Sequence, residues 1–108
     1  MKGKVYLIVD WSSSPLKYKV GITKNQIQKR IKQLKTGSSG ELVLLKHYES
    51  DNYKKIETIL HRFYNSYSTE GGKEWFELPD DKVLNFINEC QTIYENLKYL
   101  QENNYFFS

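Results

Sequence analysis

Two short segments near the N-terminus, residues 4–9 and 17–23, alternate in character with a period of two. This alternation is typical of β-strands, because successive side chains of a strand point to opposite faces of a sheet. One predicted face is almost purely apolar and holds Val5, Leu7, Val9, Tyr18, Val20 and Ile22. The other face holds Lys4, Tyr6, Ile8, Lys19, Gly21 and Thr23. The two segments therefore predict a β-hairpin with one face toward the core. On its other face, Gly21 has no side chain and lets another group approach the backbone closely.

Three later segments space their apolar residues by three and four, as on one side of an α-helix. In segment 26–36 the apolar stripe, the row of apolar residues on one side of the helix, is Ile27, Ile31 and Leu34. In segment 53–66 it is Ile56, Ile59, Leu60 and Phe63, and in segment 80–102 it is Val83, Ile87, Cys90, Tyr94 and Leu97. Residues 41–48 predict a third strand and 74–78 a short fourth extended segment, whereas the polar stretches 10–16 and 66–73 predict loops. The order ββαβαβα indicates an α/β domain with a small sheet.

The third predicted helix, 80–102, follows Pro79, and its stripe repeats at spacings of four and three over two heptads. We expect this helix to pack on the sheet, so that residues 1–78 form a core and residues 79–108 pack against it within a single domain. The alternative is a homodimer through this helix and the apolar tail Tyr105-Phe106-Phe107. The same 4-3 spacing of apolar residues occurs in coiled coils, and an exposed apolar tail is commonly buried against another protein.

Composition narrows the class of protein. A chain of 108 residues can bury one core, and 27% charged with 39% hydrophobic residues is typical of soluble globular proteins. No apolar run approaches the length of a membrane-spanning helix, and the run after the N-terminus is too short for a signal peptide. Cys90 is the single cysteine, which excludes an internal disulfide and fits a reducing compartment. We therefore expect a cytoplasmic protein with no membrane partner.

Positive charge is concentrated in the first third of the chain. Residues 1–36 hold nine Lys or Arg against one Asp, whereas residues 37–108 hold seven against twelve Asp or Glu. A basic segment joined to an acidic remainder suggests a polyanion-binding surface on one side of the molecule. The alternative is that the lysines only keep helix surfaces solvated.

Five residues are candidates for chemistry: Tyr6, Lys19, Arg30, Glu57 and His61. Hydrolysis of a phosphodiester needs help in deprotonating water, a cation to offset phosphate charge and, usually, a carboxylate that holds a divalent metal. Arg30 can grip phosphate oxygens bidentately, Glu57 can anchor Mg²⁺, and Tyr6 or Lys19 can assist in deprotonation. His61 follows Glu57 by one helical turn, either as its partner on the helix surface or as a group that orients the carboxylate.

Five patterns in order resemble the GIY-YIG nuclease superfamily. They are KVY at residues 4–6, KVGIT at 19–23, Arg30 in the first helix, ETILHRF at 57–63 and EWFEL at 74–78. The last two make the chain similar to the branch found in small phage proteins and in the meiotically up-regulated gene domain. The resemblance covers roughly residues 4–78.

The resemblance implies a fold and a set of roles. It implies an α/β (α+β) fold with a three-stranded antiparallel sheet flanked by helices, here with a long C-terminal helix, and an endonuclease that cleaves DNA with Mg²⁺ or Mn²⁺. Tyr6 matches the first-motif tyrosine, a candidate general base; Arg30 matches the arginine that contacts the scissile phosphate, and Glu57 matches the metal-binding glutamate. Candidate supporting residues are Tyr18, Gly21 and His61, and candidate nucleic-acid-binding residues are Lys24, Lys29, Arg30 and Lys32.

One catalytic position departs from the family pattern, because Lys19 stands where the second-motif tyrosine is expected. Tyr18 could replace it only through a register slip, which would turn its side chain to the other face. Lys29, next to Arg30, is an alternative phosphate contact. Two rival functions stay open: a DNA-binding module of the same fold without catalysis, and a protein-interaction subunit that uses the long helix and the aromatic tail.

Overall fold

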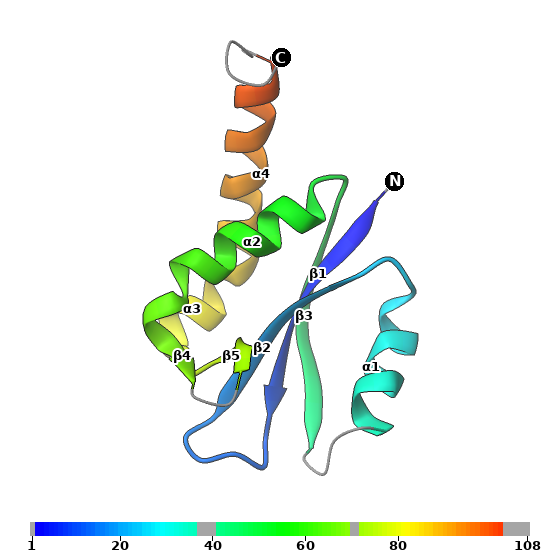
Figure 1. The fold of residues 1–108 in the computed structure, drawn as a ribbon, viewed down its shortest axis with the longest axis vertical. Coiled ribbons are helices and arrows are strands. Elements are labelled where there is room, and N and C mark those ends of the chain that lie inside the picture. The colour runs from blue at the N-terminus through cyan, green and yellow to red at the C-terminus, as the bar shows by residue number, and fades with distance from the viewer. Residues whose placement is uncertain (1, 37–40, 70–71, 103–108) are drawn as a thin grey trace.

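The computed structural model describes residues 2–36, 41–69 and 72–102 (Figure 1). Its elements are β1 (Gly3–Asp10), β2 (Lys17–Thr23), α1 (Ile27–Thr36), β3 (Leu42–Ser50), α2 (Tyr53–Phe63), the 3-10 helix η1 (Asn65–Tyr67), β4 (Ser68–Thr69), β5 (Gly72–Phe76), α3 (Asp80–Leu84) and α4 (Phe86–Glu102). The tail residues Tyr105, Phe106 and Phe107 lie outside the described part of the chain.

The described strands form one antiparallel sheet in the order β3-β1-β2-β5-β4. The expected three-stranded sheet is therefore wrong by two strands, although its core of β3, β1 and β2 is present. The added hairpin pairs with β2 only at Tyr18 and Lys19. Its strand β4 consists of two polar residues and lies inside the segment 66–73, which was predicted as a loop. A strand of two residues is too short to show an alternating pattern in the sequence.

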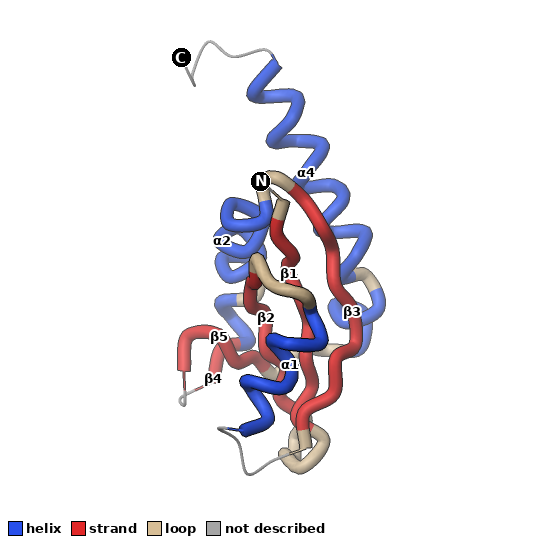
Figure 2. The backbone as a smooth tube through the Cα atoms, turned by 90° about the vertical axis from the view of Figure 1, so that its right-hand side faces the viewer, coloured by secondary structure: helices blue, strands red, loops and turns tan. Residues whose placement is uncertain are grey.

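The predicted facing of the hairpin is confirmed by its register, in which Tyr6 pairs with Gly21 and Ile8 with Lys19. One face packs against α2 and α4 through the larger core, which includes Val5, Leu7 and Val20. The other face packs against α1 through a smaller core of Tyr6, Ile8 and Leu42, with Ile27, Ile31 and Leu34 partly buried against it. Figure 2 shows α1 on one side of the strands and α2 and α4 beyond them. The sheet is thus covered on both faces.

The predicted helix 80–102 is wrong in one respect, because it is divided at Asn85 into α3 and α4. Asn85 has φ −93° and ψ 7°, outside the usual helical range for ψ. Lys46 of β3 donates from Nζ to the carbonyl oxygens of Val83 and Leu84 at 3.2 and 3.0 Å. These bonds satisfy carbonyls at the end of α3, so the helix can stop there.

Helix α4 packs through Phe86, Cys90, Ile93 and Leu97, all of which are buried. The sequence predicted Cys90 and Leu97 correctly as buried residues of this helix. It also predicted Ile87 and Tyr94, which are only partly buried. The Tyr64 hydroxyl at the end of α2 donates to Glu89 Oε2 at 3.0 Å and ties the two helices together. The last turns of α4 project beyond the sheet (Figure 2). Dimerisation through this helix stays a prediction.

None of the helices in the described part of the chain is long and apolar enough to cross a membrane.

The buried thiol of Cys90 gives a test of the core. Burial, followed by the charge of Glu89, raises the pKa of the Cys90 thiol from 9.0 to about 12. The unfolded chain loses this proton at lower pH than the folded chain does. The resulting stabilisation is fully present below about pH 9 and is lost as the pH rises toward 12. We expect iodoacetamide at pH 8 to alkylate the folded protein on the order of a hundredfold more slowly than the urea-unfolded chain.

The matched variant is Cys90→Ala, which lacks the titrating group. The free energy of unfolding of the wild type should fall more steeply between pH 9 and 11 than that of Cys90→Ala, measured by urea denaturation. Equal slopes, or rapid alkylation of the folded protein, would show that Cys90 is open to solvent.

Candidate functional site

Tyr6 and Gly21 face each other across β1 and β2 at the centre of the candidate site. A Cβ atom built on Gly21 would lie 2.5 Å from Cζ and 2.9 Å from Cε1 of Tyr6, closer than real side chains approach. The phenol ring therefore lies directly over the backbone of residue 21. Only glycine leaves this space, as the alternation of the strands predicts.

Arg30 closes the site from helix α1. Its Nε donates to the Tyr6 hydroxyl oxygen at 3.3 Å, a contact between residues 24 positions apart. The helix is held in place by Ile27, Ile31 and Leu34, which leaves Arg30 half-buried at its flank. Tyr6 itself is fully buried under this cover. The structure thus brings together two of the four predicted catalytic residues directly.

Lys19 lies on the same face of the sheet as Tyr6, two residues along β2 from Gly21. Only 9% of the residue is exposed, and its ammonium stands 5.6 Å from the ring centroid of Trp75 in β5. An aromatic face attracts a cation, so Trp75 stabilises a charge that is otherwise costly to bury. The register contains no slip between β1 and β2, so Tyr18 points into the opposite core and does not replace Lys19.

His61 fixes helix α2 to strand β2. Its Nε2 lies 2.9 Å from the carbonyl oxygen of Val20, and its ring lies 5.5 Å from that of Phe76. Because a carbonyl only accepts, Nε2 must carry the hydrogen of this bond. The Val20 carbonyl lies one residue after Lys19, the last residue of β2 that pairs with β5. His61 therefore covers the outer edge of β2, an arrangement that the spacing from Glu57 did not predict.

Glu57 stands one turn before His61 on α2, half-buried, in the layer on the opposite face of the sheet from α1. Helix α2 starts beside β1, because a Cβ atom built on Gly3 would lie 2.7 Å from the ring of Tyr53. Further along the same helix, His61 bonds to Val20 of β2. Glu57 lies one helical turn, about 5.4 Å, from each of Tyr53 and His61, and so between them along α2. Glu57 thus belongs to the layer on the α2 face of the sheet, whereas Arg30 belongs to the layer on the α1 face.

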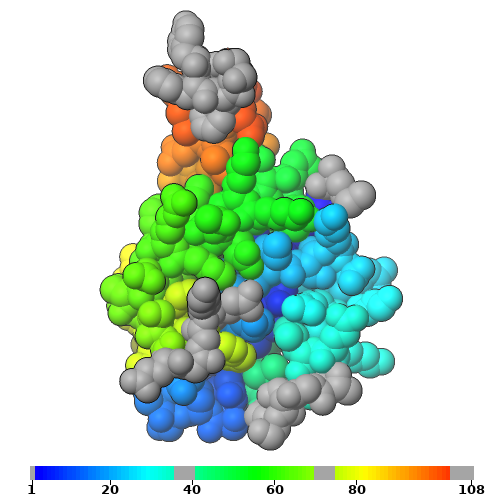
Figure 3. Space-filling model, in the orientation of Figure 1, coloured from blue at the N-terminus to red at the C-terminus, as the bar shows by residue number. Residues whose placement is uncertain are grey.

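Figure 3 shows the surface between α1 and α2, where atoms of β1 and β2 lie between the two helices. The predicted nucleic-acid-binding residues Lys24, Lys29 and Lys32 are exposed on the α1 side. Helix α1 contains no acidic residue. A polyanion that reached the Tyr6–Arg30 pair would therefore meet positive charge first.

The comparison with family models decides the membership. The model of the T5orf172 domain matches residues 3–91, which is most of the chain and includes β1, β2, α1 and α2. The chain belongs to the T5orf172 domain family. This is a family of nuclease-like phage domains. No curated protein and no solved structure matches the chain.

The described residues of this T5orf172 domain contain no group of three or more His, Cys, Asp or Glu side chains able to hold a metal ion. Mg²⁺ keeps several of its waters and commonly binds through one or two carboxylates together with substrate phosphates. A site built on Glu57 fits that pattern, whereas a cage made only of protein ligands does not. The residues present are thus compatible with magnesium that arrives with a phosphate substrate.

The sequence predicted Gly21 and Arg30 but missed Trp75 as the cover of Lys19. Trp75 reads as an ordinary core residue, and its pairing with Lys19 depends on the β4–β5 hairpin. The only available signal was the apolar alternation around residues 74–78, which indicated a strand but not its neighbour.

Substitution of Gly21 tests the close approach of Tyr6 in this T5orf172 domain. Gly21→Ala forces the buried phenol to move, and we expect a loss of about 1–3 kcal/mol in the free energy of unfolding, measured by urea denaturation. In a Tyr6→Ala background the same substitution should cost much less, because the ring that it meets is gone. Equal costs in the two backgrounds would contradict the contact.

Proposed function

We propose that the protein is a metal-dependent DNA endonuclease of the GIY-YIG type, which hydrolyses phosphodiester bonds at the edge of β2. The observation that carries the proposal is the Arg30–Tyr6 hydrogen bond over Gly21, next to the basic surface of α1. A phenol in contact with a guanidinium, together with the carboxylate of Glu57 on α2, would supply the groups that phosphodiester hydrolysis needs.

Arg30 binds the scissile phosphate in this proposal. Its Nε is directed to Tyr6, so the terminal guanidinium nitrogens can grip phosphate oxygens as a fork. A fixed fork offsets the negative charge that develops in the transition state. Lysine cannot reproduce both functions, because it offers a point charge without the Nε–H group.

Tyr6 takes part in removing a proton from the attacking water, with Lys19 as a neighbouring cation on the same face. The guanidinium beside the phenol oxygen would offset negative charge on that oxygen as its proton leaves. Lys19, held against Trp75, adds a second positive charge in a poorly solvated position. Tyr6 is buried in the unbound protein, so substrate binding must open the cover over its hydroxyl.

Glu57 would hold Mg²⁺ or Mn²⁺, which when bound supplies Lewis-acid stabilisation of charge on the phosphate and leaving oxygens. His61 acts as a positioning residue, because its bond to Val20 sets how α2, and with it Glu57, stands along β2. Lys24, Lys29 and Lys32 bind the DNA backbone and give affinity without base readout.

The test is nicking of supercoiled plasmid by the purified wild-type protein in Mg²⁺ or Mn²⁺, with EDTA as the control. We expect nicked circles only when the metal is present.

The burial of Tyr6 and the lysine at position 19 favour a second candidate, a DNA-binding module without catalysis. This candidate predicts salt-sensitive binding of duplex DNA with no nicking in either metal. A plasmid that stays supercoiled, together with a measurable gel shift, would replace the first proposal with the second. Absence of both would remove the two proposals together.

A further inference from the structure

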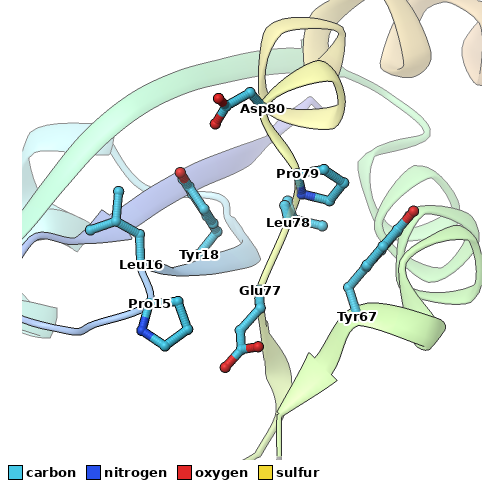
Figure 4. Close-up of a pocket in the computed structure, with 8 residues that line it drawn as sticks. All are labelled: Pro15, Leu16, Tyr18, Tyr67, Glu77, Leu78, Pro79 and Asp80. Carbon is cyan, nitrogen blue, oxygen red and sulfur yellow. The ribbon is translucent and has the colours of Figure 1, made fainter.

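A pocket of about 480 Å³ lies on the face of the sheet opposite to Tyr6 and Lys19. Pro15, Leu16 and Tyr18 form one wall, and the segment 77–80 that leaves β5 forms the other (Figure 4). Its apolar surface comes from Pro15, Leu16, Leu78 and Pro79. None of these residues belongs to the candidate nuclease site.

Tyr18 contributes a hydroxyl group to this pocket. The residue is only 6% exposed, and because no buried polar side-chain atom of the described residues lacks a hydrogen-bond partner, the hydroxyl, which forms no bond within those residues, is open to solvent at the pocket. Burial, and then the charge of Asp80, raise the pKa of Tyr18 above its ordinary value of 10.0. In Figure 4 the hydroxyl of Tyr18 and the carboxylate of Asp80 point toward the same end of the pocket. A hydroxyl that opens into the pocket can accept a hydrogen bond from a bound group.

Two carboxylates border the same pocket. Glu77 and Asp80 are exposed, and neither forms an ion pair within the described part of the chain. The nearby Lys82 does not neutralise them, since it is paired with Glu89 at 3.8 Å. The pocket therefore combines an apolar floor with two negative charges, although the chain as a whole has a net charge of +3.

We propose that this pocket binds an arginine or lysine side chain carried on an extended segment of a partner protein. The aliphatic stem lies on Pro15, Leu16 and Pro79, and the cationic head donates to the Asp80 carboxylate and the Tyr18 hydroxyl. Long cationic side chains combine an apolar stem with a charged tip in this way. Glu77, at the other end of the wall, attracts a second basic residue of the segment.

Nucleic acid does not fit this pocket, because its phosphates would face two carboxylates without a compensating cation. The pocket and the basic α1 surface lie on opposite faces of the sheet, so a basic segment and DNA can bind together. The proposal does not depend on nuclease activity.

The test is a titration of the full chain with the acetylated, amidated peptide Pro-Pro-Arg-Pro-Pro, followed by ¹H–¹⁵N NMR. A second peptide carries citrulline, the neutral isostere of arginine, at the central position. We expect amide shifts confined to residues 16–18, 67, 77, 78 and 80. The affinity for the citrulline peptide should be at least about tenfold lower, because a charge-assisted bond is lost. Asp80→Asn and Tyr18→Phe should each weaken binding at least threefold, whereas Glu102→Gln, an exposed acid at the end of α4, should leave it unchanged.

Several results would overturn the proposal. They are equal affinity for the arginine and citrulline peptides, no effect of Asp80→Asn, shifts on α1 rather than at the pocket, and displacement of the peptide by duplex DNA. If Tyr18→Phe does not fold, Glu77→Gln takes its place, because that side chain is exposed. Binding of N-acetylarginine amide as tight as that of the peptide would show that a small cation, and not a protein segment, is the ligand.

Discussion

Glu57→Gln should remove metal-dependent nicking of plasmid DNA, lowering its rate by a factor of about 10³. A metal ion contributes several kcal/mol to the transition state, and every 1.36 kcal/mol is a factor of ten. The amide keeps the size of the side chain but binds Mg²⁺ poorly, so the loss reports the charge and not the packing. The measurement is a nicking time course in Mg²⁺ at equal protein concentration.

Two controls show whether the loss is specific. Glu102→Gln removes another acidic side chain, exposed at the end of α4, and should nick at the wild-type rate. Binding of duplex DNA by Glu57→Gln in EDTA should equal that of the wild type, since the lysines of α1 are untouched. Persistent cutting by a clean preparation of Glu57→Gln would remove the metal role from this residue.

Tyr6→Phe should lower the nicking rate by a factor of about 10²–10⁴, the range expected when a group that assists proton transfer is removed. The ring still fills the space over Gly21, so the fold persists. Stability should fall by about 1 kcal/mol, because the Arg30 Nε–H loses its partner. Binding of duplex DNA separates the two effects: Tyr6→Phe should bind DNA as the wild type does while it nicks slowly, which a loss of folding would not produce.

Arg30→Lys and Lys29→Ala distinguish the two neighbouring candidates for the phosphate contact. Only Arg30 touches Tyr6, whereas Lys29 is exposed. Arg30→Lys should therefore lose most of the activity, and Lys29→Ala should lose only DNA affinity, more at low salt than at high salt. The reverse order would move the catalytic role to Lys29. Tyr6→Phe with full activity would contradict the proposed site as a whole.

The facing of Tyr6, Lys19 and Gly21 could be predicted because the opposite face of the two strands is almost purely apolar. A slip by one residue would move Val5, Leu7 and their neighbours from the core to the other side, so the hydrophobic pattern fixes the register strongly. The stripe of α1 is specified in the same way by Ile27, Ile31 and Leu34. Local periodicity therefore predicted the packed face of each element, whereas the Arg30–Tyr6 contact depends on how α1 lies on the sheet.

Features that depend on contacts distant in sequence could not be predicted. The end of α3 depends on Lys46, a residue of β3 whose ammonium reaches the carbonyls of Val83 and Leu84. The orientation of His61 depends on the carbonyl of Val20, which is exposed to it because β5 is short. The placement of Glu57 across the sheet from α1 follows from how α2 packs, and spacing along the chain does not encode it.

The central claim is that Glu57, from one layer, and the Tyr6–Arg30 pair, from the other, act together at the edge of β2. Paramagnetic broadening by Mn²⁺ measures this directly, in ¹⁵N-labelled wild type and Glu57→Gln. We predict that Mn²⁺ broadens the amide signals of Gly21 and Ile22 together with those around Glu57, leaves Val43 on the distant strand β3 sharp, and loses these effects in Glu57→Gln. Broadening restricted to α2, with Gly21 and Ile22 unaffected, would contradict the account.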